Sequence, residues 1–295
     1  MTAGLLLIDK PPGPTSHDVV GRVRRLANLR RVGHAGTLDP LAGGLLLLGL
    51  GPAARLLEYL VGLDKTYETT IRLGQSTTTY DAEGAVTAER PVTADAAAVT
   101  AALAAFRGPL RQRVPPHSAV KRDGRPLYER ARRGETLDLP QREVVIHALD
   151  LLAYEPPLLA LRVVCSSGTY VRSLAHDLGA ALGCGGHVAA LRRTAVGPFD
   201  VAQAIPLEAL TADTLARWLL PPAAAVAHLP RLDVDEAAAT RLSLGQRLAA
   251  PLGAPDGPAA AFGPDGRFLG VVAVEGDVLR PRKMFTAATA HAEET

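Results

Sequence analysis

The sequence predicts an α+β protein in which a large mixed domain is followed by a small β barrel. Helix-like and strand-like segments mingle before residue 221 without the regular rhythm of a doubly wound parallel sheet. The Pro- and Ala-rich stretch 221–230 is typical of an interdomain boundary, and short strands separated by Gly and Pro turns follow it. At 295 residues the chain is about twice as long as one average domain. We therefore expect domains over 1–225 and 228–285, and a tail over 286–295.

A buried strand and a capped helix are expected first. Residues 4–9 are almost continuously apolar, which predicts a buried strand, and the prolines after it force an extended turn. Thr15 and Asp18 then have the spacing of a capping box. Because apolar residues follow at helical intervals, we expect a helix over 16–28 that leaves its arginines exposed.

The middle of the chain is expected to add a strand, further helices and a hairpin. Residues 66–73 alternate between apolar and polar, which places Tyr67 on the apolar face of a strand. The remaining expected segments are a Gly-rich loop over 31–44, helices over 52–63, 94–106, 126–133 and 168–182, and an antiparallel strand pair over 144–154 and 159–166.

Composition excludes several classes of protein. A hydrophobic share of 47% and a charged share of 21% exclude a disordered chain. Two cysteines, Cys165 and Cys184, cannot form a disulfide framework, and residues 1–10 lack the features of a signal peptide. The most apolar run, 45–50, is too short to span a bilayer. We expect a cytoplasmic protein without a membrane role.

The distribution of positive charge is more informative than the formal net charge of +2. Arginines crowd residues 22–31, and a second basic cluster occupies 111–133. Such clusters can bind phosphates, although a solvated helix face has the same appearance. The candidate RNA-backbone contacts are Arg24, Arg25, Arg30, Lys121, Arg132 and Arg133.

Cofactor and metal sites have little support in the sequence. Gly49 and Gly51 imitate a dinucleotide fingerprint, but the ribose-binding acid expected about 20 residues later is absent. A zinc site could in principle use Cys165, His176, Cys184 and His187, but their spacings contain no metal-binding clamp. We expect neither a cofactor nor a metal.

Three residues form a chemically coherent set. Asp39 lies in the Gly-rich loop and precedes Pro40, which biases its backbone away from helical geometry. Arg172 falls in the first turn of an expected helix, where it can reach a carboxylate. Together with Tyr67 they supply a nucleophilic carboxylate, a guanidinium that keeps it ionised and an aromatic platform, which suits chemistry on a planar base. The alternatives are a simple Asp-Pro turn and a surface arginine.

Five sequence motifs resemble the bacterial TruB family, the tRNA pseudouridine-55 synthases. They share the order and approximate spacing of that family's motifs, and the resemblance covers residues 3–285. The segments 244–247 and 268–272 resemble the RNA-binding PUA domain that ends many members. Small residues at Ala35 and Thr37 are a mild departure. The five motifs are 4–11, 33–42, 65–67, 168–172 and 191–194.

The resemblance implies a pseudouridine synthase catalytic domain with a mixed, mainly antiparallel sheet and a PUA-like barrel. It implies that a uridine in the T loop of tRNA, at position 55, is turned outward and isomerised to pseudouridine without cofactor or metal. The tRNA T arm would be the partner, no protein partner would be obligatory, and a monomer is expected.

The same resemblance implies roles for individual residues. Asp39 would be the nucleophile, Arg172 its ion-pair partner, and Tyr67 would stack on the target base and assist deprotonation at carbon 5. The residues implied to bind substrate are His34, in the space vacated by the base, Tyr170 and Leu191, lining the base pocket, and Lys10.

Other function classes give different expectations for Asp39. A non-catalytic RNA-binding or RNA-folding protein would need only the arginine clusters and the barrel, and phosphate binding gives no reason to place a carboxylate among arginines. A nicotinamide-dependent oxidoreductase would depend on Gly49 and Gly51 alone. Whether Asp39 attacks carbon 6 of the base or carbon 1′ of the sugar stays open.

Overall fold

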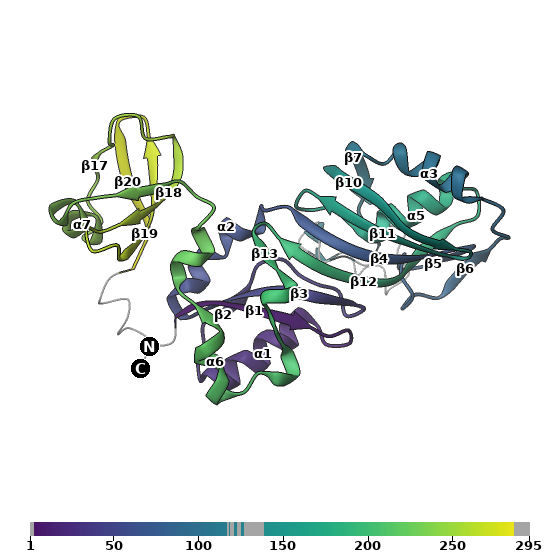
Figure 1. The fold of residues 1–295 in the computed structure, drawn as a ribbon, viewed down its shortest axis with the longest axis horizontal. Coiled ribbons are helices and arrows are strands. Elements are labelled where there is room, and N and C mark those ends of the chain that lie inside the picture. The colour runs from purple at the N-terminus through teal and green to yellow at the C-terminus, as the bar shows by residue number, and fades with distance from the viewer. Residues whose placement is uncertain (1–2, 117, 119–120, 123–124, 127–138, 286–295) are drawn as a thin grey trace. The chain divides into compact units, whose positions relative to one another are not determined.

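A computed structural model describes residues 3–116, 118, 121–122, 125–126 and 139–285 (Figure 1). The chain divides into two compact units, each built from separate stretches of sequence. The first comprises Met1–Leu38, Leu45–Val61 and Val201–Thr295, and the second comprises Asp39–Gly44 and Gly62–Asp200. The expected domains over 1–225 and 228–285 stay a prediction. Residues 127–133 of the expected basic helix and the expected tail 286–295 lie outside the described residues.

The first unit begins with the expected strand and capped helix. Strand β1 (Gly4–Lys10) pairs in parallel with β14 (Ile205–Pro206) and antiparallel with β15 (Leu219–Leu220). Helix α1 (Ser16–Ala27) begins with the predicted capping box, in which the Asp18 amide donates to Thr15 Oγ1 and the Thr15 amide donates to Asp18 Oδ2. Its buried face includes Val19, Val20 and Val23, so both elements are confirmed.

One expectation for residues 31–44 is wrong. Within the expected loop over 31–44, β2 (Val32–His34) is a strand, and it pairs antiparallel with β3 (Ala42–Leu50). The expected helix over 52–63 is confirmed in outline, as a 3-10 helix, η1 (Gly51–Leu56), followed by one turn of α-helix, α2 (Glu58–Val61). Glycine misled the loop prediction, because in this part of the chain glycine also serves close packing. A Cβ on Gly49 would lie 2.8 Å from Ala54 Cα, which explains Gly49 without a dinucleotide.

The later part of the first unit contains the expected small β structure. A curled five-stranded sheet has the order β16-β18-β19-β20-β17, and α7 packs its Ala239 and Leu242 into the core of that sheet. The remaining bounds in this unit are η2 (Val201–Gln203), η3 (Leu207–Ala209), α6 (Ala212–Trp218), η4 (Pro222–Val226), β16 (Arg231–Asp233), α7 (Glu236–Ser243), β17 (Leu248–Ala249), β18 (Gly257–Phe262), β19 (Phe268–Glu275) and β20 (Val278–Met284).

The second unit is organised around an antiparallel run of five strands, β12-β4-β11-β10-β7. The predicted strand over 66–73 and the predicted hairpin are confirmed as β4 and as β10 with β11. The bounds are β4 (Lys65–Leu73), β5 (Gln75–Thr77), β6 (Val86–Glu89), α3 (Ala96–Ala104), β7 (Gly108–Arg113), β8 (Lys121–Arg122), β9 (Arg125–Pro126), β10 (Gln141–Glu155), β11 (Leu158–Cys165), α5 (Val171–Ala181), β12 (Gly186–Val196) and β13 (Phe199–Asp200).

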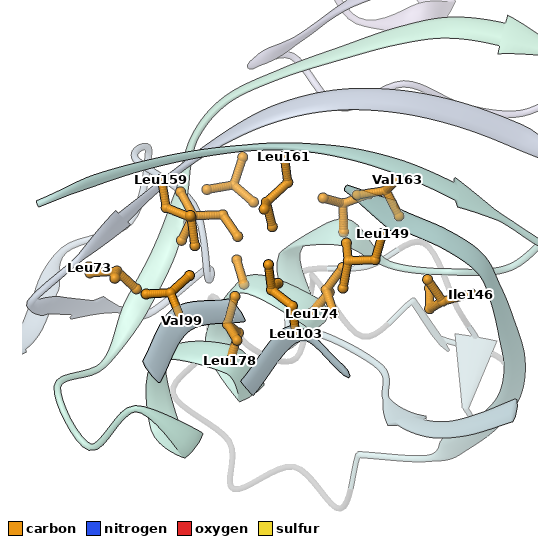
Figure 2. Close-up of a cluster of buried hydrophobic side chains, with 14 of the residues drawn as sticks. Leu73, Val99, Leu103, Ile146, Leu149, Leu159, Leu161, Val163, Leu174 and Leu178 are labelled. Atoms are coloured by element: carbon orange, nitrogen blue, oxygen red, sulfur yellow. The ribbon is translucent and has the colours of Figure 1, made fainter. Parts of the chain in front are cut away.

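Helices α3 and α5 bury the apolar side chains of this sheet (Figure 2). Leu103 from α3 and Leu174 and Leu178 from α5 meet Leu159 and Leu161 from β11, and all five are almost completely buried. The apolar alternation of the strands thus meets the apolar faces of the helices, and the second unit has its own hydrophobic core. The predicted helices over 94–106 and 168–182 are confirmed with shorter bounds.

The Asp39 loop ends where the backbone of β3 closely approaches that of β12. The first residues of β3 lie parallel to β12, with Ala42 opposite Leu191 and Gly44 opposite Arg193. Gly44 has φ +99°, and a Cβ there would lie 2.2 Å from the backbone oxygen of Arg193. Only glycine fits this position without moving the two strands apart.

None of the helices in the described part of the chain combines the length and the apolar character that crossing a membrane requires.

Substituting Gly44 with alanine is expected to destabilise the protein. Strain at positive φ and the clash with Arg193 should together lower the free energy of unfolding by about 2 to 5 kcal/mol. Gly183→Ala is the matched control, because Gly183 has φ +76° but open space around its Cβ position, and it should cost only about 1 kcal/mol. Denaturant unfolding of both variants measures the difference, and equal costs would contradict the proposed packing constraint.

Candidate active site

The Asp39 loop is anchored on both sides of the carboxylate. On one side, Ser16 Oγ of α1 accepts a hydrogen bond from the Leu38 amide at 2.8 Å and donates one to the Leu38 carbonyl at 3.0 Å. On the other side, the Ala42 amide donates to the Asp39 carbonyl at 3.0 Å. Ala42 is also the first residue of β3 and pairs with Leu191 of β12. These contacts restrict the backbone at Asp39, and 38% of its side chain remains exposed.

Helix α5 is held at its first residues by a buried glutamine. Tyr170 is the N-cap of α5, and its own side chain makes no cap hydrogen bond. Instead, the Tyr170 amide donates to Gln112 Oε1 at 3.0 Å, and Gln112 Nε2 donates to the Tyr170 carbonyl at 3.3 Å. Gln112 lies on β7, so the edge of the sheet fixes the helical turn that carries Arg172.

Arg172 bridges two carboxylates. Its Nε lies 3.0 Å from Asp39 Oδ2, and its Nη1 lies 3.3 Å from Asp81 Oδ2. Nη1 also donates to the Thr79 carbonyl at 3.1 Å. The Arg172 side chain is only 7% exposed and that of Asp81 only 4%. The structure therefore confirms that the three-residue set proposed from sequence contains a real Asp39–Arg172 ion pair.

Asp81 is one of the residues that the sequence patterns did not reveal. Its Oδ1 accepts hydrogen bonds from Thr79 Oγ1 and from the Glu83 amide, while Oδ2 faces Arg172. Asp81 also forms a β-bridge with Val188 of β12. Each carboxylate oxygen of Asp81 thus has its own partners, and Asp81 contacts Arg172 through Nη1 whereas Asp39 contacts it through Nε.

Tyr67 and Leu191 lie on the same face of neighbouring strands. Leu191 of β12 is opposite Thr69 of β4, and Tyr67 is two residues from Thr69, so their side chains project in one direction. Both side chains are partly buried against the hydrophobic core of this unit. Burial raises the pKa of the Tyr67 hydroxyl, the Arg193 charge lowers it, and the Asp39 charge raises it further. Tyr67 is therefore within electrostatic reach of Asp39.

The Tyr170 side chain is close enough to Arg172 for the arginine charge to act on its hydroxyl. Burial raises the pKa of Tyr170, and the charges of Arg142 and Arg172 oppose that rise. The Arg142 guanidinium lies 6.0 Å from the centre of the ring. The predicted role of Tyr170 in lining a base pocket stays a prediction, but its backbone demonstrably starts the helix that carries Arg172.

Two predicted substrate-binding residues belong to the first unit. Lys10 is completely buried, and its Nζ donates to the carbonyls of Pro11 and Pro14 at 2.9 and 2.8 Å. It therefore fastens the proline turn after β1. His34 lies on β2, and its ring meets the edge of His17 at a centroid distance of 6.2 Å. Their contacts with substrate stay predictions.

The predicted phosphate contacts are only partly described. Arg24, Arg25 and Arg30 are exposed on and just after α1, as the sequence predicts. Arg24 also donates through Nη2 to the Val32 carbonyl at 2.9 Å, so that side chain is held in place. The side chain of Lys121 and the residues Arg132 and Arg133 lie outside the described residues.

Metal-ligating side chains do not gather in the described residues. Over that part of the chain, no group of three or more His, Cys, Asp or Glu side chains lies close enough to hold an ion. Cys165 and Cys184 are buried thiols, and burial raises the pKa of Cys165 to about 11.

Comparison with known families decides the assignment. The model of the N-terminal domain of TruB family pseudouridylate synthases matches residues 24–171. The model of the tRNA pseudouridylate synthase B C-terminal domain matches 172–227, and that of the C-terminal region of tRNA pseudouridine synthase II matches 229–286. This chain belongs to the TruB family. Its enzyme class is therefore pseudouridine synthase, an isomerase.

Similar TruB proteins match nearly the whole chain. The protein named tRNA pseudouridine synthase B in Arthrobacter sp. (strain FB24) is 48% identical and covers 97% of both chains. The protein of that name in Thermobifida fusca (strain YX) is 51% identical and covers 91% of this chain and 94% of its own.

A solved structure supports the TruB fold. A chain from the crystal structure of a Cbf5-Nop10-Gar1 complex is 28% identical, with a TM-score of 0.76, and the match covers 96% of this chain and 85% of that chain. The expected α+β class, with its mixed sheet and small C-terminal β structure, is confirmed.

Removing the charge of Asp81 is expected to slow catalysis by this TruB protein. In Asp81→Asn, the guanidinium of Arg172 keeps its position less firmly, so the single-turnover rate of pseudouridine formation should fall about 10- to 100-fold, equivalent to about 1.5 to 3 kcal/mol. Binding of RNA should change little. Glu83→Gln, an exposed residue in the same turn, is the control and should retain the wild-type rate. An unchanged rate in Asp81→Asn would show that Arg172 needs only one carboxylate.

Proposed function

We propose that this protein isomerises the uridine at position 55 in the T loop of tRNA to pseudouridine, with Asp39 as the nucleophile. The observation that carries the proposal is the partly exposed Asp39 carboxylate held 3.0 Å from the buried Arg172 guanidinium. The proteins that match most of this chain are named tRNA pseudouridine synthase B, which supports tRNA as the substrate.

The reaction needs a nucleophile and proton transfer but consumes no second reactant. The bond between N1 and C1′ breaks, and a bond between C5 and C1′ forms. C5 loses a proton and N1 gains one, so uridine and pseudouridine have the same atoms and electrons. A carboxylate can form a covalent intermediate at carbon 6 of the base or at carbon 1′ of the sugar, and both routes use Asp39 in the same way. No cofactor is required by this balance.

Arg172 keeps the nucleophile ionised and oriented. A guanidinium stays charged at all ordinary pH values and donates in a fixed plane. Placed 3.0 Å from one oxygen of Asp39 in a largely buried site, it favours the negative form of the carboxylate. The contact also limits rotation of the Asp39 side chain, so the carboxylate meets the sugar or base in a narrow range of directions.

The target base has to leave its stack before Asp39 can reach it. Turning a base outward costs a few kcal/mol, and stacking on an aromatic ring offsets part of that cost. Tyr67 supplies the ring, while Leu191 and Tyr170 line the base pocket and His34 fills the space that the base leaves. Lys10 is a further substrate-binding residue. Tyr67 also assists removal of the C5 proton.

Binding of the tRNA T arm is attributed to positive side chains outside this set. Arg24, Arg25 and Arg30 contact phosphates from α1 and its end, with Lys121, Arg132 and Arg133 as further contacts. The C-terminal sheet, which resembles a PUA domain, adds RNA-binding surface. The enzyme works in the cytoplasm as a monomer without an obligatory protein partner.

Replacing Asp39 by asparagine tests the nucleophile. The amide keeps the size of the side chain and loses its charge, so Asp39→Asn should abolish pseudouridine formation while tRNA affinity stays within about threefold of wild type. Mass-shift or tritium-release assays on transcripts with single T-loop uridines replaced identify the modified position. Asp150→Asn, an exposed carboxylate on β10, is the control. Normal turnover in Asp39→Asn would refute the mechanism, and product at another uridine would refute the position.

The salt dependence of tRNA binding tests the arginine contacts. Each phosphate contact that is lost reduces the slope of log affinity against log salt concentration by about 0.9. The combined substitution of Arg24, Arg25 and Arg30 by glutamine should therefore make the slope about 2 to 3 shallower. Arg162→Gln is the control, because Arg162 is exposed between Asp150 and Glu68 in the strand register. An unchanged slope in the triple variant would identify these arginines as an ordinary solvated face.

A further inference from the structure

A second arginine in the same unit is buried more deeply than Arg172. Arg193 on β12 is 1% exposed and is among the largest fully buried side chains of the described residues. Burying a charge is unfavourable unless hydrogen bonds compensate it. The proposed chemistry assigns Arg193 no role, although its strand also carries Leu191, two residues earlier and on the same face.

Strand pairing places Arg193 directly beside Tyr67. Arg193 is the register partner of Tyr67 on the antiparallel strand β4, and it is the partner of Gly44 on the parallel strand β3. The side chains of Arg193 and Tyr67 therefore project from the same face at neighbouring positions. Gly44 contributes no side chain to that face, and its close approach brings the strand after Asp39 against the Arg193 backbone.

The register places the Arg193 guanidinium next to the Tyr67 hydroxyl, and hydrogen bonding from the Arg193 side chain is one of the causes that lower the pKa of Tyr67. A guanidinium has five N–H donors and no acceptor, so the phenolic oxygen of Tyr67 must be the acceptor. The hydroxyl proton of Tyr67 then cannot point toward Arg193. The chemistry of the pair thus restricts the orientation of the Tyr67 hydroxyl.

We propose that Arg193 is a positioning residue that acts through Tyr67: it anchors the hydroxyl oxygen from the strand side, so that the hydroxyl proton and the remaining lone pair face the substrate space beside Asp39. This inference rests on the proposed function, because the direction of the proton matters only if a base reacts there. Arg193 itself does not touch the base.

The surrounding charges agree with this arrangement. The Arg193 charge opposes the rise in the Tyr67 pKa that burial and Asp39 cause. On the same face, burial and the Arg193 charge lower the pKa of Lys65 to about 8, and Lys65 Nζ donates to the Leu63 carbonyl. Arg193 therefore influences the two ionisable groups that flank it along β4. Arg192 is the contrasting neighbour, because it is exposed on the opposite face of β12.

A double-mutant cycle tests the proposal by single-turnover pseudouridine formation at saturating tRNA. In the protein that keeps Tyr67, Arg193→Lys should lower the rate at least about tenfold, since lysine keeps the charge but loses the planar donor geometry. In the Tyr67→Phe background, the same substitution should lower the rate by less than about threefold, because the hydroxyl it acts on is gone. The dissociation constant for tRNA should stay unchanged throughout. Arg192→Lys is the matched control and should keep the wild-type rate.

Thermal unfolding gives a second measurement that needs no Arg193 variant. Tyr67→Phe should lower the Tm by about 2 to 10 °C, because a buried guanidinium N–H loses its acceptor. Tyr80→Phe is the control: the Tyr80 ring stacks on His176, and among the described residues no hydrogen bond of its hydroxyl is found. If Arg193→Lys fails to fold, the difference in Tm between Tyr67→Phe and Tyr80→Phe tests the contact between Arg193 and Tyr67.

The outcomes separate this proposal from the proposed function. If the wild-type protein forms no pseudouridine, the proposed function fails. If it does, but Arg193→Lys slows the reaction equally in both backgrounds, Arg193 does not act through the Tyr67 hydroxyl. A Tm for Tyr67→Phe that matches the Tyr80→Phe control also overturns the positioning role.

Discussion

The Arg172 guanidinium is the group on which the candidate site depends. It contacts Asp39 through Nε and Asp81 through Nη1, and it is almost completely buried. These three side chains carry one positive and two negative formal charges, so the arginine is attracted from two directions. A buried arginine with only one such partner would have more freedom to tilt, and the direction of its N–H groups would vary. Here Asp81 contacts Nη1 of the guanidinium, and the Nε edge is left to bind the Asp39 nucleophile.

This electrostatic arrangement is supported by hydrogen bonds that come from several strands. Gln112 on β7 holds the start of α5, Asp81 is tied to β12 by its bridge with Val188, and Ala42 ties the Asp39 loop to the same strand. Each contact involves backbone groups, whose positions vary less than those of flexible side chains. The sheet of the second unit therefore positions the charged groups.

Sequence patterns predicted the elements whose signals are local. The capping box of Thr15, the alternation in β4 and the pairing of Asp39 with Arg172 were all predicted from residue types and motif order. The loop over 31–44 was predicted wrongly because glycine marks both turns and tight strand packing, and only the partner strands distinguish these uses.

The missed residues have no local signal. Asp81 occupies a short polar segment that looks like an ordinary turn, and Gln112 and Arg193 are single polar residues in strands. Their importance comes from partners supplied by strand pairing: Tyr170 for Gln112 and Tyr67 for Arg193. Propensity and periodicity describe neighbours along the chain, so they cannot reveal partners that only tertiary structure supplies.

The pairing of β1 has a consequence for the growing polypeptide on the ribosome. One edge of β1 is adjacent to β3, which is synthesised soon afterwards, but the other edge pairs with Ile205 and Pro206 and with β15. At about 5 to 20 residues per second, those partners emerge roughly 10 to 40 seconds later. During that interval an apolar strand edge is open to solvent and to other nascent chains. The buried Lys10 and the proline turn at the end of β1 limit how far that edge can extend.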